Sequence, residues 1–282
     1  MSQLSPDETL RIVRHFLLSS PPGQFEDVLY DIRELVANDQ LLNTGAFDIF
    51  RTYNVEQLIP VEVPNQTYKV ILSKYNEITP QTYLDPVSDQ VLTVDHVKGQ
   101  VTGVSPASSD ILNNSLKQKK DKLVKAIQKY VDDHYLSGIS SVFPSQRDDQ
   151  KGELIICITA SKFNDKNFWS GRWRSVYRVS FADDKVKVSG SMKVNCHYYE
   201  NGNVQLNTSK EHAETVDGGD SFADNIVKML VKAEGNFQTQ IDTSCANLNE
   251  TFKSLRRPLP MTKTLFDFAS SQHKLAREFG GN

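Results

Sequence analysis

Hydrophobic residues near the N-terminus recur every three or four positions, in three stretches separated by helix-breaking sequences. Ser5, Pro6 and Glu8 form a helix start, with a capping box and a proline in the first turn. Breaks follow at Pro21-Pro22-Gly23 and at Asn43-Thr44-Gly45. The apolar stripes are Leu10, Val13, Phe16 and Leu17, then Phe25, Val28, Leu29, Ile32, Leu35 and Val36, and then Phe47, Phe50 and Tyr53. This pattern predicts a three-helix bundle over residues 1–55.

The pattern changes over residues 56–110, where prolines interrupt short apolar runs such as Tyr68–Leu72. The prolines are Pro60, Pro64, Pro80, Pro86 and Pro106. Short apolar runs between turn-forming residues predict a small β-rich subdomain.

Helical spacing resumes near Ile111 and gives way to strand patterns from about residue 140 to about residue 210. One helical face carries Leu116, Leu123, Ile127, Tyr130 and Val131. The strand candidates are Leu154–Ile158, Trp173–Phe181 and Val186–Tyr199, the last as one long strand or two. Asn201-Gly202, just before Val204, is a strong hairpin signal. Short connections favour an antiparallel meander of about five strands, whose free edge has to be covered or paired.

A long helix follows, starting at Asp220 or Ser221 and ending at Pro258 and Pro260. Its near-heptad stripe is Ile226, Val227, Leu230, Phe237, Ile241, Leu248, Phe252 and Leu255. At 1.5 Å per residue this helix is about 45 Å long, more than a compact domain needs. A second amphipathic segment, with Leu265, Phe268, Leu275 and Phe279, then has no surface of its own chain left to cover.

These elements predict an α+β fold in four parts. They are the N-terminal helical bundle over 1–55, the β-rich subdomain over 56–110, a core over 111–257 and a C-terminal amphipathic segment over 258–282. The core combines a helix, a five-stranded antiparallel sheet and the long helix that crosses it.

Composition indicates an ordinary soluble protein. Of the 282 residues, 38% are hydrophobic and 24% charged, which suits neither a disordered nor a membrane protein. No apolar run reaches the roughly 18 residues that cross a bilayer, and the N-terminus lacks secretory features. Cys157, Cys196 and Cys245 lack metal-ligand spacing, which favours reduced thiols in a cytoplasmic protein.

Charge is unevenly distributed along the chain. With six basic and two acidic residues, Lys253–Asn282 carries +4, so the net charge of −3 leaves −7 on residues 1–252. A basic end on an acidic body favours contact with an anionic surface, or it is a solvated helical face. The composition leaves both readings open.

Catalytic and metal-binding motifs are absent from the sequence, which contains no glycine-rich phosphate loop, C-x-x-C, H-E-x-x-H or G-x-S-x-G. Asp95-His96 has no evident partner and is predicted to form a surface turn. In His197–Glu200, strand alternation places His197 with Tyr199 on one face and Tyr198 with Glu200 on the other, a poor catalytic arrangement. We therefore expect no enzyme activity, cofactor or metal.

Aromatic and basic residues interleave in Phe168–Arg174. Such a stretch can stack nucleobases and bind phosphates. Alternatively, Trp169 and Trp173 pack under the long helix while Arg172 and Arg174 pair with carboxylates. The overall acidic charge favours the second reading.

Three segments resemble the alpha subunit of F-actin capping protein, and the resemblance spans essentially the whole chain. They are Lys166–Ser175, His197–Leu206 and Phe252–Pro260. Asn201 stands where the family usually has an acid, and Ser254 where it usually has Ala or Glu. Asn before Gly still favours a turn, and the basic residues around Ser254 are kept.

The resemblance implies an obligate heterodimer with a beta subunit of similar fold. Each subunit is expected to give five antiparallel strands to one ten-stranded sheet, crossed by a long helix from each, and a mobile C-terminal extension, the tentacle, carries actin affinity. Other partners known for the family are proteins with capping-protein-interaction motifs, myotrophin, twinfilin and acidic phosphoinositides. The expected location is the cytoplasm and its cytoskeleton.

The predicted function is to cap the barbed end of the actin filament and block gain and loss of subunits. Lys253, Arg256 and Arg257 share one helical face, with Lys263 beyond the prolines, and are expected to steer docking onto acidic actin. The apolar residues Leu265, Phe268, Leu275 and Phe279 are expected to enter a cleft of a terminal actin. The alternative is a nucleic-acid-binding protein that uses the basic tail.

Overall fold

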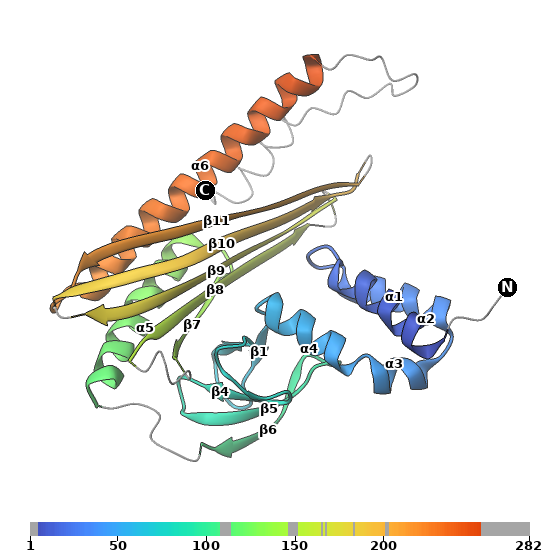
Figure 1. The fold of residues 1–282 in the computed structure, drawn as a ribbon, viewed down its shortest axis with the longest axis horizontal. Coiled ribbons are helices and arrows are strands. Elements are labelled where there is room, and N and C mark those ends of the chain that lie inside the picture. The colour runs from blue at the N-terminus through green and yellow to red at the C-terminus, as the bar shows by residue number, and fades with distance from the viewer. Residues whose placement is uncertain are drawn as a thin grey trace.

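The structure is a computed structural model in which a five-stranded sheet forms the middle layer (Figure 1). It describes residues 5–107, 114–145, 152–164, 166, 168–182, 184–200 and 203–254, with the backbone alone at 43–44, 114–115 and 245–254. Among these residues no helix is long and apolar enough to cross a membrane.

The N-terminal part has four helices where the sequence predicts three. They are α1 (Pro6–Leu18), α2 (Phe25–Val36), α3 (Asp39–Gly45) and α4 (Phe47–Glu56). The break predicted at Asn43-Thr44-Gly45 is wrong, because these residues belong to α3 and the interruption falls at Ala46. The Asn38 side chain accepts a hydrogen bond from the Leu41 amide at 3.0 Å and caps this additional helix.

The first helix starts as predicted, with reciprocal hydrogen bonds between Ser5 and Glu8. Val13, Leu17 and Ile32 are buried in the shared core of the helices. Leu35 is 84% exposed and Phe16 is also exposed, so their predicted core positions are wrong. A bundle of short helices covers only the centre of each apolar stripe and leaves its flanks in solvent.

The β-rich region contains two small antiparallel sheets. The sequence predicts short strands here, although not their number or pairing. The strands are β1 (Pro60–Glu62), β2 (Lys69–Ile71), β3 (Glu77–Thr79), β4 (Thr82–Asp85), β5 (Gln90–Asp95) and β6 (Gln100–Pro106). β1 pairs with β2, and β3 to β6 form a meander in chain order. Their shared core includes Val61, Val70, Tyr83 and Leu92.

The central sheet is the predicted five-stranded antiparallel meander, in the order β11-β10-β9-β8-β7. Its strands are β7 (Ile139–Pro144), β8 (Leu154–Asn164), β9 (Trp169–Ala182), β10 (Lys185–Tyr198) and β11 (Val204–Asp217). β10 is one long strand, and its pairing of Tyr198 with Val204 confirms the hairpin around residues 201–202, which themselves lie outside the described residues.

Two helices, α5 (Asn114–His134) and α6 (Phe222–Ser254), cover one face of the sheet (Figure 1). The predicted stripe of α5 is buried here, with Leu123 and Ile127 fully enclosed. Trp173 of β9 contacts Phe237 of α6 edge to face, with ring centres 5.6 Å apart. Trp173 therefore packs under the long helix, as predicted.

The opposite face packs against the N-terminal half of the chain. Leu58, Ile71, Phe143 and Ile155 form this contact together with Cys157. Burial raises the pKa of the Cys157 thiol to about 12, so this cysteine is an unreactive core residue.

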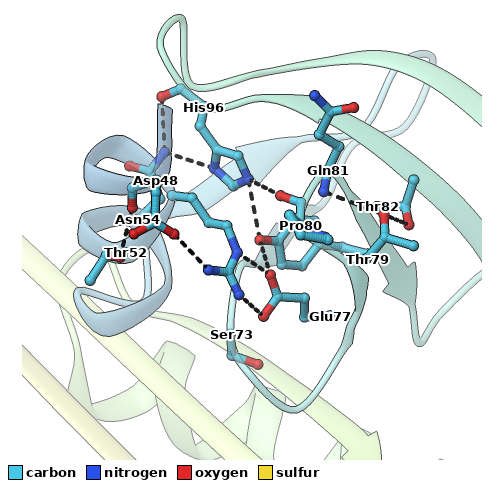
Figure 2. A network of polar contacts seen from close by, with 12 residues as sticks. Asp48, Thr52, Asn54, Ser73, Glu77, Thr79, Pro80, Gln81, Thr82 and His96 are labelled. Carbon is cyan, nitrogen blue, oxygen red and sulfur yellow. Dashed lines mark hydrogen bonds and ion pairs between the residues drawn. The ribbon is translucent and has the colours of Figure 1, made fainter. Parts of the chain in front are cut away.

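His96 is buried at 2% exposure, so its predicted place in a surface turn is wrong. Figure 2 shows its ring between Asn54 and Pro80. Asn54 of α4 donates to its Nδ1 at 3.2 Å, and its Nε2 donates to the Pro80 carbonyl at 3.0 Å. Burial lowers the pKa of His96, which fits this neutral tautomer. Asp95 does form the turn, because its carboxylate accepts from the amide of Val97 at 3.0 Å.

An ion pair beside His96 ties the same two parts together. Arg51 of α4 donates to both carboxylate oxygens of Glu77 at 2.5 and 2.8 Å (Figure 2). Tyr83 donates to the same carboxylate at 3.1 Å. Helix α4 is thus fixed to the β-rich region by polar contacts as well as by packing.

Candidate functional site

Helix α6 lies on the sheet along its first part and diverges from it toward its C-terminal end (Figure 1). Ile226, Leu230 and Phe237 are buried against the sheet, and Ile241 is partly buried. The next residues, 242–244, are exposed. This part of α6 therefore does not pack on the sheet.

One buried carboxylate anchors α6. Glu234 is 4% exposed and accepts hydrogen bonds from four hydroxyl groups. Ser175 and Tyr177 of β9 donate to Oε1 at 2.7 and 2.8 Å. Tyr130 of α5 donates to Oε2 at 2.5 Å, and Tyr135, just after α5, donates to the same oxygen. Burial, together with the nearby carboxylate, raises the pKa of all three tyrosines.

Glu234 was not among the residues predicted from the sequence, although its position carries a signal. The residue lies on the apolar stripe, between Leu230 and Phe237, where a helix that packs on a sheet normally carries hydrophobic side chains. A charged residue at such a position is almost always partnered.

The predicted basic and apolar site residues lie at or beyond the end of α6. Lys253 belongs to its last turn, where only the backbone is described. Arg256, Arg257, Lys263, Leu265, Phe268, Leu275 and Phe279 lie outside the described residues. Their role in actin binding stays a prediction.

The two edges of the central sheet differ. At β7, the amide of Ile71 in β2 donates to the Ser141 hydroxyl at 3.3 Å, so another strand lies beside this edge. Within the described part of the chain, the 14-residue β11 pairs with β10 alone. A long strand with one unpaired side is a template for a strand of another chain.

The stretch Phe168–Arg174 is largely buried apart from Phe168, which is exposed, and its side chains face two layers. Arg172 and Arg174 point away from α6, and both are more than nine-tenths buried. Arg172 donates to Gln57 and Ser161 at 3.2 Å each, and Arg174 donates to the Glu56 carbonyl at 2.6 Å. The predicted pairing with carboxylates is wrong, because the carbonyl at the end of α4 and neutral side chains supply the acceptors.

Arg174 is incompletely satisfied. Its Nε is buried without a hydrogen-bond partner, while its other contact is the side-chain oxygen of Asn195. Burial, and then the neighbouring charge of Arg172, lower the pKa of Arg174 to about 10. A guanidinium enclosed in this way is not available to phosphates.

The strand end at His197 shows the predicted alternation. His197 stacks on Tyr199 with ring centres 5.1 Å apart, and Tyr198 donates to Glu200 on the other face. His197 accepts from Gln24 at 2.9 Å, and a hollow of about 300 Å³ lies beside this contact. Among the described residues, no group of three or more His, Cys, Asp or Glu side chains could hold a metal ion.

Comparison with known proteins gives a consistent result. A family model described as F-actin capping protein alpha subunit matches residues 13–278. The F-actin-capping protein subunit alpha of Dictyostelium discoideum is 35% identical over 97% of this chain and 98% of its own. That of Arabidopsis thaliana is 33% identical over 98% of this chain and 94% of its own.

A solved structure has the same fold. The homodimeric actin capping protein alpha subunit of Plasmodium berghei aligns with a TM-score of 0.76 and 23% identity, covering 92% of this chain and 99% of the other.

Proposed function

Because the chain belongs to the F-actin capping protein alpha subunit family, we propose that it caps actin filaments as the alpha subunit of a dimer. The observation that carries the proposal is the family match over residues 13–278, which includes both the central sheet and the C-terminal segment. The family is named for a structural activity on actin, and we propose no catalytic role. An actin-associated, cytoskeletal location follows from this function.

We propose that β11 is the strand that joins the partner subunit. Its free side offers amides and carbonyls along 14 residues, and pairing in an antiparallel register would continue the sheet. The preferred partner is a capping protein beta subunit. The homodimer of the Plasmodium berghei relative makes a second copy of the chain the alternative partner.

Binding to the barbed end is assigned to the end of α6 and the segment after it. The C-terminal end of α6 and the residues after it would present Lys253, Arg256 and Arg257 to acidic actin, and opposite charges speed association. Leu265, Phe268, Leu275 and Phe279 would then bury apolar surface, at roughly 1.5–3 kcal/mol per side chain before ordering costs. Charge would set the association rate, and apolar burial the residence time.

A nucleic-acid role has little support. Trp169, Arg172 and Arg174 are buried, and Trp173 packs against Phe237 of α6. Phe168 is thus the exposed aromatic residue of this stretch, and a single ring offers little surface for stacking bases. The relatives named above are all called capping proteins.

The test is a seeded actin elongation assay with the chain expressed alone and with a beta subunit. We expect the dimer with the beta subunit to stop elongation from barbed ends. Lys253→Ala with Arg257→Ala should slow association, and Leu265→Ser with Phe268→Ser should speed release. Unchanged elongation with well-folded dimer would refute the proposed function, and capping by the chain alone would favour the homodimer.

A further inference from the structure

The position of the C-terminal end of α6 depends on contacts that the helix makes about twenty residues earlier. From Glu234 to Ser254, α6 spans about 30 Å at 1.5 Å per residue. A tilt of about 10° at Glu234 would move the end of the helix by about 5 Å over that length. Small changes in how α6 sits on the sheet are therefore amplified at its C-terminal end.

Apolar packing alone fixes such a helix poorly. The stripe of α6 that faces the sheet consists of similar side chains at successive turns, such as Ile226, Leu230 and Ala233. Hydrophobic burial is non-directional, so small rotations and tilts of α6 about this stripe bury similar apolar areas. A slip of a full residue would turn the helix by about 100° and move the stripe off the sheet.

The contacts of Glu234 are directional and come from two sides. Oε1 is held from the sheet by Ser175 and Tyr177, and Oε2 from the α5 side by Tyr130 and Tyr135. Trp173 in turn donates from its indole nitrogen to the Ser175 hydroxyl at 2.7 Å, which leaves that hydroxyl its proton for Glu234. Shifting α6 by one residue would break all four bonds within the buried layer.

We infer that Glu234 is a positioning residue that fixes the rotation and register of α6 and so sets where the C-terminal segment meets its target. The consequence for capping rests on the proposed function, but the position of α6 can be measured without it. Buried polar groups used in this way specify one arrangement while adding little to stability.

The test compares two replacements of the network. Glu234→Gln keeps the shape, because its oxygen can accept from Ser175 and Tyr177 while its amide donates to Tyr130 and Tyr135. Glu234→Met with Tyr130→Phe, Tyr135→Phe and Tyr177→Phe replaces the network by apolar groups of similar volume. Such replacements of buried polar groups often leave stability unchanged or raised, so this variant should fold.

The position of α6 is read from the distance between spin labels at Lys187 on the sheet and Thr243 on α6, both exposed. All labelled variants also carry Cys196→Ser and Cys245→Ser. The distances are measured in the complex with the beta subunit. A matched pair, Lys187 with Asp224, reports on the start of α6, on the other side of Glu234. Seeded actin elongation is measured on the same samples.

We expect the Gln variant to keep the narrow Lys187–Thr243 distance distribution of the parent. In the apolar variant the distribution should become about twofold wider or shift by more than about 2 Å, with about 3- to 10-fold faster release from filament ends. The Lys187–Asp224 distances should change less.

A distribution as narrow as that of the parent in the apolar variant would overturn the inference, because packing alone would then position α6. An altered distribution together with unchanged release would refute the link to capping. Failure of the parent complex to cap would refute the proposed function. The Lys187–Thr243 distances would still test whether Glu234 positions α6.

Discussion

Side chains of strand β9 take part in buried charged groups in two different layers of the protein. The two layers differ in how these charges are paired with hydrogen-bond partners. On the helix side, Ser175 and Tyr177 help to surround the carboxylate of Glu234. On the opposite side, Arg172 and Arg174 bring two guanidinium groups under α4. Because successive side chains of a strand point to opposite faces, the carboxylate lies on one side of the sheet and the two guanidinium groups lie on the other.

The difference lies in how completely each charge is satisfied. The carboxylate of Glu234 accepts four hydrogen bonds, two at each oxygen. Arg174 keeps an unpaired Nε and lies next to a second positive charge. A complete buried network specifies one arrangement, whereas an incomplete one adds little beyond its packing.

The largest effect is expected from removing donors on the helix side. Ser175→Ala with Tyr177→Phe leaves Oε1 of the buried Glu234 without a donor, and should lower the free energy of unfolding by about 3–5 kcal/mol. Urea unfolding of the dimer measures this loss. A loss below about 1 kcal/mol would mean that the carboxylate finds other partners or water.

Alkaline pH should act on the Glu234 network and on Arg174 with opposite signs. The pKa values of Tyr130, Tyr135 and Tyr177 are raised by folding, so the unfolded chain loses these protons first and stability falls as pH rises above about 10. The pKa of Arg174 is lowered to about 10, so its deprotonation in the folded state opposes that fall. Each proton contributes about 1.4 kcal/mol per pH unit.

The three tyrosines outnumber the one arginine, and the Cys157 thiol, whose pKa burial raises to about 12, acts with the same sign as the tyrosines. We therefore expect the dimer to lose stability above pH of about 10. Arg174→Met should make the loss steeper, and Tyr177→Phe should make it shallower. Unfolding midpoints measured at several alkaline pH values test both signs. A shallower loss in Arg174→Met would contradict the assignment of the Arg174 shift.

A smaller effect is expected from Arg174→Met at neutral pH. The change removes two hydrogen bonds but also an unpaired buried donor and the repulsion with Arg172, so stability should change by about 1 kcal/mol or less. The matched comparison is Arg172→Met, measured in the same urea titration. It should lower the free energy of unfolding by about 1.5–3 kcal/mol, because Nε and Nη1 of Arg172 both have neutral hydrogen-bond acceptors. A larger loss of stability for Arg174→Met than for Arg172→Met would mean that incomplete hydrogen bonding does not explain the difference between the two layers.

The smallest effect should come from a charge in solvent. Lys122 of α5 pairs with Asp220 at 3.1 Å, and both side chains are exposed. Lys122→Ala should leave the unfolding midpoint unchanged within error, because water screens such pairs. A clear shift would show that charges at the start of α6 matter more than their exposure indicates.

Local pattern was enough to predict most elements. The capping box at Ser5, the stripe of α5 and the hairpin that joins β10 to β11 all depend on residues within a few positions of each other. The extra helix α3 escaped prediction because Asn43-Thr44-Gly45 resembles a stop, while the cap at Asn38 outweighs it. The actin-binding residues stay predictions, since nearly all lie outside the described part of the chain.

By itself, the sequence determined most of the helices and strands and the family of the chain, because periodicity and signature segments are local properties. Only the tertiary structure decided which polar residues are buried together. Tyr130 meets Glu234 across 104 positions, Arg174 meets Glu56 across 118, and Asn54 reaches His96 across 42. A hydrogen bond depends on position in space to within a few tenths of an ångström, and no spacing along the chain encodes that over such separations.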